Sequence, residues 1–161
     1  MTELRQPWVV FRVDGRRYAL PLSVVERVER AAAPLPLPGA PDGIAGALNL
    51  HGRILPLAEA RNRLDLPPRA MIPADQMLVV ADSLSFLLLV DAVEEVLETS
   101  PDRFTPVESV CPGGTRPGIL GILEDPEAGL VLMCTPGVFV QPEGRAVLAA
   151  TLQALTGENS G

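Results

Sequence analysis

Residues 43–57 have the sequence Gly43-Ile44-Ala45-Gly46-Ala47-Leu48-Asn49-Leu50-His51-Gly52-Arg53-Ile54-Leu55-Pro56-Leu57. Two apolar runs flank a polar tetrapeptide, residues 49–52, whose Asn and Gly can supply the positive φ angles of a tight reversal. This pattern predicts a β-hairpin. Because both arms are apolar almost throughout, we expect both of their faces to be covered, as in a barrel or a sandwich. The tip should then be rigid and exposed.

The composition favours an all-β fold. A chain of 161 residues is long enough for one domain, or for two very small ones. Hydrophobic residues make up 47% of the chain and aromatic residues only 4%, so we expect a core of Val, Leu, Ile and Ala. Seventeen prolines and fourteen glycines divide the chain into short elements, which favours many strands with tight connections.

Charge and terminal sequence predict a cytoplasmic protein. The net charge of −7 argues against nucleic acid and anionic lipid as partners. The first six residues contain no basic stretch leading into an apolar run, so we expect no signal peptide. No uncharged apolar run reaches about 18 residues, the length needed for direct membrane insertion. Cys111 and Cys134 lack the spacing of a redox pair and are expected to be free thiols.

A sequence unit occurs twice, at an offset of 68 residues. The matched pairs are Tyr18 with Phe86, Leu20 with Leu88, Leu22 with Val90, Val25 with Val93, Glu26 with Glu94 and Val28 with Val96. The hairpin also repeats, because Gly121 corresponds to Gly46 and residues 130–133 correspond to residues 54–57. Each half alone has too little core to be stable, so the repeat predicts two related small barrels packed on each other.

The remaining elements are predicted from turn signals and periodicity. They are strands at 8–13, 18–22, 77–81 and 86–90, a short turn leading into a strand over 23–30, an extended connector over 31–41, a short helix over 58–64 and a terminal helix over 144–157.

The chain shows no combination of residues typical of catalysis. Its single histidine, His51, excludes a multi-histidine metal site, and no G-x-S-x-G motif surrounds any serine. It contains no lysine, which excludes P-loop and Schiff-base chemistry. Adjacent carboxylates such as Glu94-Glu95 point to opposite faces of a strand and cannot share a proton. We therefore predict a protein without catalytic residues, cofactor or metal.

Two alternatives stay open at this point. One is a small-ligand-binding or hydrolytic β-barrel that uses His51 with Glu59 or Asp91. It requires an enclosed polar pocket beside His51. The other is a scaffold that self-associates through its barrels.

Three stretches, in this order, carry a resemblance to a known family. They are Tyr18-Ala19-Leu20-Pro21-Leu22 with Val25 and Val28, then Gly46-Ala47-Leu48-Asn49-Leu50-His51-Gly52-Arg53-Ile54-Leu55-Pro56-Leu57 with Arg61, then Leu89-Val90-Asp91-Ala92-Val93-Glu94-Glu95-Val96-Leu97. Together they resemble the CheW family of chemotaxis coupling proteins, over about residues 8 to 140. The hairpin with its NLxGxxxP core is the most specific part of the match.

The resemblance implies a CheW-like domain at residues 8–140, followed by the helix at 144–157. It implies two interleaved, five-stranded barrel subdomains of Src-homology-3-like type, with halves at roughly 8–66 and 76–140 and a hydrophobic groove between them. It further implies a non-enzymatic adaptor that joins the cytoplasmic tip of a methyl-accepting chemoreceptor to the regulatory domain of a CheA-type histidine kinase. The receptor-facing candidates carried over are Val25, Val28, Gly46, His51, Val93 and Val96. Each of the four valines could equally be ordinary core.

The chain departs from the family pattern at a charged pair. The family usually has arginine where this chain has His51 and glutamate where it has Arg27. Those two family residues can pair, so the change to Arg27 and His51 should remove or reverse the attraction. The sequence also has Glu59-Ala60-Arg61 in place of Asp-Leu-Arg. We interpret the chain as a divergent member, serving chemotaxis or a related pathway such as pilus-based movement.

Overall fold

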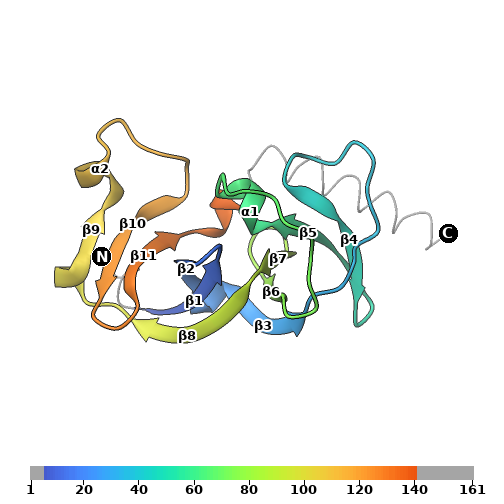
Figure 1. Ribbon diagram of the computed structural model, residues 1–161, viewed down its shortest axis with the longest axis horizontal. Helices are drawn as coiled ribbons and strands as arrows, with labels where there is room; N and C mark the ends of the chain where they lie inside the picture. Colours follow the sequence, from blue (N-terminus) through green and yellow to red (C-terminus); the bar gives the residue numbers. More distant parts are fainter. Residues whose placement is uncertain (1–5, 141–161) are drawn as a thin grey trace.

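The computed structural model describes residues 6–140 as a β-rich molecule with very short helices (Figure 1). Its elements in chain order are β1 (Pro7–Val13), β2 (Arg16–Pro21), η2 (Leu22–Val24), β3 (Val25–Arg30), β4 (Ile44–Leu50), β5 (Arg53–Glu59), α1 (Ala60–Arg63), β6 (Gln76–Val80), β7 (Phe86–Val90), β8 (Ala92–Glu98), η3 (Pro101–Arg103), β9 (Phe104–Pro106), α2 (Val107–Val110), β10 (Ile119–Asp125), β11 (Gly129–Cys134) and η4 (Pro136–Val138). The all-β prediction is confirmed. The predicted helix at 144–157 lies outside the described residues.

The strands form two sheets. The first sheet has the order β8-β1-β2-β11-β10-β9, and the second has the order β3-β6-β7-β5-β4. Each sheet takes strands from both of the ranges 8–66 and 76–140. Figure 1 shows the first sheet on the left and the second on the right. The first sheet has six strands rather than the expected five, because the three-residue β9 adds to β10.

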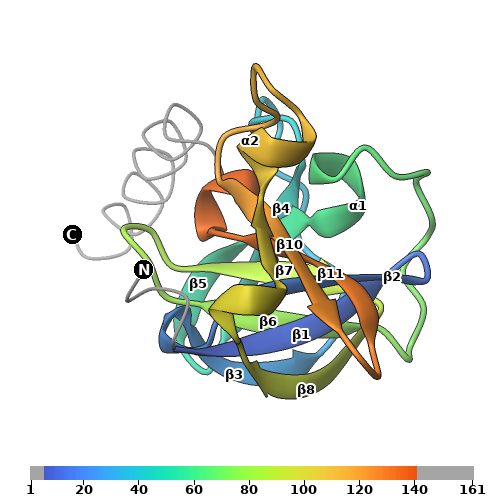
Figure 2. The same ribbon diagram turned by 90° about the vertical axis from the view of Figure 1, so that its left-hand side faces the viewer.

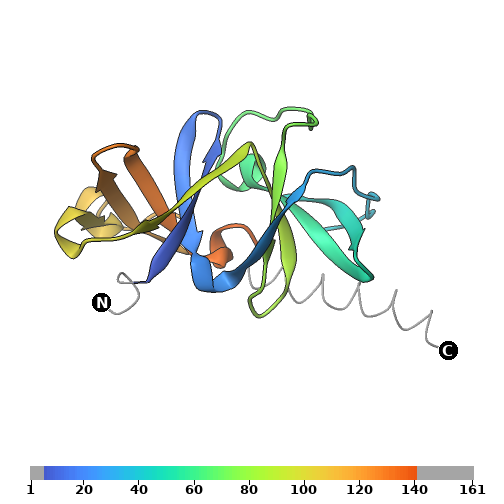
Figure 3. The same cartoon turned by 90° about the horizontal axis from the view of Figure 1, so that it is seen from below.

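The two sheets exchange one strand each. β3 directly follows β2 of the first sheet but pairs with β6 of the second. β8 directly follows β7 of the second sheet but pairs with β1 of the first. The chain therefore crosses between the sheets at η2, here called the first crossover, and at Asp91, the second crossover. Viewed from below in Figure 3, β8 passes in front of β1.

The central hairpin is formed by β4 and β5, as predicted. Its turn residues with positive φ are His51, at 50°, and Gly52, at 89°. The prediction that Asn49 supplies a positive φ is wrong. Asn49 stays in β4, and its Oδ1 accepts a hydrogen bond of 2.9 Å from the Gly52 N–H. His51 adopts the left-handed conformation because a two-residue reversal needs it at both central positions.

Gly46 and Gly121, which the repeat matched to each other, both lie at a register shift of their hairpin. A Cβ on Gly46 would lie 2.1 Å from the carbonyl oxygen of Leu35, and one on Gly121 would lie 2.3 Å from that of Thr105. Leu35 pairs with Ala47 through backbone hydrogen bonds of 2.8 and 2.9 Å, which places the chain after β3 along the outer edge of β4. Leu35 therefore takes the place in the second sheet that β9 takes in the first.

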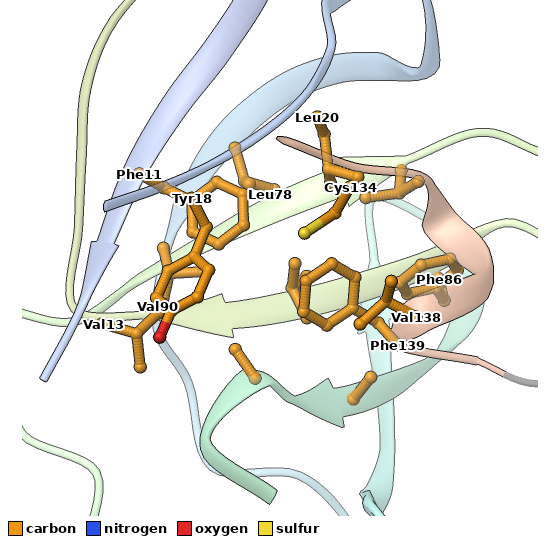
Figure 4. Packing of buried hydrophobic residues seen from close by; sticks show 14 of the residues in the cluster. Phe11, Val13, Tyr18, Leu20, Leu78, Phe86, Val90, Cys134, Val138 and Phe139 are labelled. Atoms are coloured by element: carbon orange, nitrogen blue, oxygen red, sulfur yellow. The ribbon is translucent and has the colours of Figure 1, made fainter. Parts of the chain in front are cut away.

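Three hydrophobic clusters stabilise this arrangement. One lies within each sheet, around Trp8 in the first and around Leu57 in the second. The largest lies between the sheets and is called the inter-sheet core (Figure 4). It contains Phe11 and Phe139, whose ring centroids are 6.1 Å apart, and both are buried. Most of the few aromatic residues are thus concentrated in the core rather than absent from it.

Candidate partner-binding surface

The valines of β3 lie at one border of the inter-sheet core. Val25 is opposite Val80, and Val28 is opposite Leu78, in the antiparallel pair of β3 and β6. Val80 and Leu78 belong to the inter-sheet core. Residues directly opposite each other in an antiparallel pair project to the same face. Both β3 valines therefore lie on the face of the second sheet that is turned toward the first.

The valines of β8 occupy the equivalent place on the first sheet. Val93 is opposite Phe11, and Val96 is opposite Val9, in the pair of β8 and β1. Phe11 and Val9 are again members of the inter-sheet core. β3 and β8 are the edge strands of their sheets, and both run along the lower margin of the molecule in Figures 1 and 2. We call Val25, Val28, Val93 and Val96 the valine margin.

Burial divides the valine margin into two layers. Val25 and Val93 are partly buried and pack against the inter-sheet core. Val28 and Val96 are 39% and 54% exposed. The deeper pair therefore packs against the inter-sheet core, and the shallower pair exposes apolar side chains on the same two strands. Exposed apolar side chains that continue a core are a common feature of interaction sites.

His51 lies at the hairpin tip and is not part of the valine margin. Its side chain is 69% exposed, and its Nε2 is 3.4 Å from Glu29 Oε1. Arg27 Nε lies 2.7 Å from the same oxygen, and Arg53 Nη1 donates a 3.0 Å hydrogen bond to Glu26 Oε2. We call these five residues the tip cluster. They connect β3 with the β4–β5 hairpin, at the opposite edge of the second sheet.

Arg27 and Glu29 lie on the face of β3 opposite to the valines. Arg27 is paired with Val79 and Glu29 with Met77, and both partners belong to the cluster inside the second sheet. Arg27 and His51 both lie beside Glu29, at 2.7 and 3.4 Å. Glu29 was not predicted from the sequence, although its two-residue spacing from Arg27 on a strand indicates a shared face.

Gly46 does not present a surface of its own. It is buried, and the Leu35 backbone lies against it. Because Gly46 has no side chain, the Leu35 segment can approach β4 closely. Leu35 itself is 69% exposed and was not predicted from the sequence.

A second charged group, here called the crossover clamp, surrounds Asp91. Arg61 Nη2 and Arg69 Nη2 donate hydrogen bonds of 2.8 and 2.9 Å to the two Asp91 oxygens. Arg69 also holds the buried Asp75 through bonds of 2.7 and 3.1 Å, and Arg61 Nη1 lies 3.5 Å from Asp14 Oδ1. The adjacent cavity has a volume of about 10 Å³, close to the space of a single water molecule. A small-molecule ligand does not fit there.

Hydrogen bonding stabilises the charged forms of Arg69 and Asp75. Burial raises the pKa of Asp75, but the hydrogen bonds from Arg69 and from the Ile72 N–H together lower it by more. The pKa of Asp75 is therefore below its ordinary value. The hydrogen bond to Asp75 in turn raises the pKa of Arg69. Asp75 is therefore held as a carboxylate and Arg69 as a cation.

The hydrolytic arrangement with His51 is not assembled. Glu59 and Asp91 line the small cavity of the clamp, and His51 is at the hairpin tip with Glu29. Within residues 6–140, no three His, Cys, Asp or Glu side chains are grouped so that they could hold a metal. Cys111 and Cys134 are free thiols, as predicted, and burial raises the pKa of Cys134 to about 12. In the same part of the chain, no helix has the length and apolar character to span a membrane.

Comparison with known proteins gives a consistent family. Residues 7–136 match the family model of the CheW-like domain. The chemotaxis protein CheW of Bacillus subtilis (strain 168) is 32% identical over 73 residues, which are 45% of this chain and 47% of that protein. The chemotaxis protein CheW of Rhizobium meliloti (strain 1021) is 27% identical over 141 residues, covering 86% of this chain and 90% of that one.

A solved structure shares the fold. The scaffolding protein TtCheW from Thermoanaerobacter tengcongensis superposes with a TM-score of 0.69 at 23% sequence identity. The superposition covers 81% of this chain and 88% of that chain.

Proposed function

The chain belongs to the CheW-like family, and on this premise we propose that it is a non-enzymatic adaptor in chemotaxis-like signal transduction. It couples the cytoplasmic tip of a chemoreceptor to the regulatory domain of a CheA-type histidine kinase, and it works in the cytoplasm. The names of its relatives, two chemotaxis proteins CheW and a scaffolding protein, support this role. The low identities agree with a divergent member.

The valine margin is the observation that carries the proposal. Val28 and Val96 come from edge strands of different sheets and expose apolar surface at the border of one shared core. An amphipathic helix offers a matching stripe, with apolar residues spaced three and four apart. A signalling contact of this kind can bury less than about 1,200 Å² and be of modest affinity. The receptor tip is the partner that we assign to this surface.

The other receptor-facing candidates act in different ways. His51 is exposed and can touch a partner directly from the hairpin tip. Gly46 is buried, so its contribution is to the path of the Leu35 segment rather than to contact. The kinase regulatory domain would pair barrel to barrel with one end of the molecule.

Self-association is the second candidate. Leu130 and Ile54 occupy equivalent positions in the two hairpins and are 66% and 37% exposed. Exposed apolar residues on equivalent hairpins could join successive copies end to end. Light scattering over a concentration series separates this scaffold from a monomeric adaptor, because only the scaffold gains mass with concentration.

Titration tests the adaptor proposal. A receptor-tip fragment and a CheA regulatory domain are each titrated into the protein by calorimetry. We expect both to bind, and we expect Val96→Asp to weaken the receptor fragment at least tenfold because a charge would replace the exposed apolar contact. Val110→Asp is the matched control, since Val110 is 58% exposed and lies in α2, outside the valine margin. If neither partner binds at high micromolar concentration, the adaptor proposal is wrong.

A further inference from the structure

The second crossover consists of one residue whose carboxylate binds both sheets. Asp91 Oδ2 accepts a 2.9 Å hydrogen bond from the N–H of Asp14, in the turn between β1 and β2. The same oxygen accepts from Arg61 of α1, and Oδ1 accepts from Arg69, in the loop before β6. The Asp91 N–H donates a 3.0 Å bond to the carbonyl of Arg12 in β1. Asp91 thus links the first sheet to α1 and to the loop before β6, which both belong to the chain between β5 and β6 of the second sheet.

The two arginines are themselves held in place. Arg61 is only 14% exposed and also donates to the Pro67 carbonyl. Arg69 is fixed by two bonds to Asp75, which is 3% exposed and accepts a further 3.0 Å bond from the Ile72 N–H. Charge-assisted hydrogen bonds of this kind are short and strongly directional. Asp91 therefore meets preorganised donors rather than flexible side chains.

The position of β8 depends on this point. β8 begins at Ala92, directly after Asp91, and pairs with a single strand, β1. Its register against β1 shifts between Val10 and Phe11, so the ladder alone is interrupted close to the crossover. The Val93 N–H donates a 2.8 Å bond to Gln76 Oε1 of β6, in the second sheet. The start of β8 is consequently fixed relative to both sheets.

We propose that Asp91 is a positioning residue for the partner surface: the crossover clamp fixes the start of β8 relative to both sheets and so sets the position of Val96 in the valine margin. The inference rests on the proposed function, because it assigns the clamp a role in receptor binding. The clamp residues are proposed to affect receptor binding without contacting the receptor. Asp14, Arg61, Arg69 and Asp75 act only through Asp91.

The first test uses the protein without a partner. Valine methyl groups are labelled, and NMR spectra of the wild type and of Asp91→Asn are compared. The amide variant keeps the shape of Asp91 but loses its charge. We expect shifts and broadening at Val93 and Val96, with Val131, buried in the first sheet, unchanged. Unchanged signals from Val93 and Val96 in the folded variant would overturn the proposal, whether or not the receptor binds.

The second test uses both partners. Asp91→Asn should weaken the receptor-tip fragment about tenfold while leaving the affinity for the kinase regulatory domain within twofold. Asp65→Asn is the matched control, because it removes a two-bond Arg116 pair on an exposed carboxylate that is not part of the crossover clamp, and it should change neither affinity. An equal loss of both partners in Asp91→Asn would make the clamp a general stability element and overturn the positioning role.

A milder variant guards against unfolding. Arg69→Lys keeps a cation but cannot span Asp75 and Asp91 with one planar fork. We expect an intermediate loss of receptor affinity and smaller shifts at the same two valines. If the wild type itself binds no receptor fragment, the proposed function fails, and the NMR comparison still decides whether the clamp sets β8.

Discussion

The two crossovers solve the same topological problem with different chemistry. The first, η2, turns between β2 and β3, and its Val24 packs against the inter-sheet core. Its backbone is tied to the second sheet by a 2.7 Å bond from the Ala81 N–H to the Val24 carbonyl. The second crossover relies on the carboxylate of Asp91 and on two arginines. Ser23 and Asp91 are equivalent at the offset of the repeat.

The first crossover is stabilised by the core beside it, whereas the second depends on side chains from other segments of the chain. The apolar crossover needs only a core that the fold provides in any case, so it tolerates changes of charge and salt. The ionic crossover needs Arg61 and Arg69, which come from other segments and must be held by their own partners. The edge strand that follows the ionic crossover, β8, is therefore the one whose position a single substitution can alter.

The largest expected effect comes from breaking the ionic side. Asp75→Asn leaves Arg69 without its two-bond partner at a site where Asp75 is 3% exposed. Removing one member of a buried ion pair is destabilising, and we expect a loss of about 2–3 kcal/mol in the free energy of unfolding, below that of a fully buried pair because Arg69 is partly exposed and keeps Asp91 as a partner. Urea denaturation measures the change.

Asp65→Asn provides the comparison for this prediction. It also breaks an Arg–Asp pair with two hydrogen bonds, both from Arg116 Nη2, but the Asp65 side chain is 77% exposed. Surface pairs contribute less than about 1 kcal/mol, so this variant should be nearly as stable as the wild type. Equal losses in the two variants would contradict the claim that burial makes the clamp important.

Acidification sharpens the same contrast. The pKa of Asp75 is lowered in the folded protein, so its ionised form contributes stability that is complete above the unfolded pKa of about 3.9 and is lost as pH falls through the folded pKa. The stability difference between the wild type and Asp75→Asn should therefore be constant near neutral pH and shrink below about pH 4. Denaturation curves at several pH values test this, and a difference that is independent of pH down to the acid limit would refute it.

A smaller effect is expected on the apolar side. Val24→Ala removes two methyl groups from a partly buried position and should cost roughly 1 kcal/mol. This cost should not change with salt, because no charge is involved. Repeating the denaturation at low and at high salt checks the point, and a strongly salt-dependent cost would show that the first crossover is not apolar in its energetics.

The sequence predicted the parts of the fold that local chemistry determines. The hairpin, the correspondence of Gly46 with Gly121, and the turn before β3 follow from apolar runs, glycine positions and the repeat. The strand exchange is different, because nothing in residues 25–30 indicates whether they pair with β2 or with β6. The range of the helix predicted at 58–64 was also too long, since β5 continues to Glu59 and α1 covers only Ala60–Arg63.

The candidate site was only partly predictable for a similar reason. The repeat identified the four valines, but their exposure depends on where each sheet ends, and so Val25 and Val93 could not be told from Val28 and Val96. The crossover clamp joins residues that are up to 77 positions apart, such as Asp14 and Asp91, and it has no periodic signal. Contacts between polar residues in separate loops depend on the tertiary structure, so the sequence pattern does not predict them.

The smallest expected effect comes from changing charges in the tip cluster, which joins β3 to the β4–β5 hairpin. In the double variant Arg27→Glu with His51→Arg, a new arginine faces both Glu29 and the introduced glutamate, in place of the contact of 3.4 Å between His51 and Glu29. Because these side chains are exposed, we expect a stability change below about 1 kcal/mol. We expect the affinity for a receptor-tip fragment to rise by a few fold, since the pair typical of the family is restored while the valine margin is untouched.

Calorimetric titration of the double variant against the two single variants measures this affinity. Unchanged affinity would mean that the tip cluster takes no part in receptor binding. Since the tip cluster lies on the other face of β3 from Val28, such a result would restrict the partner surface to the valine margin.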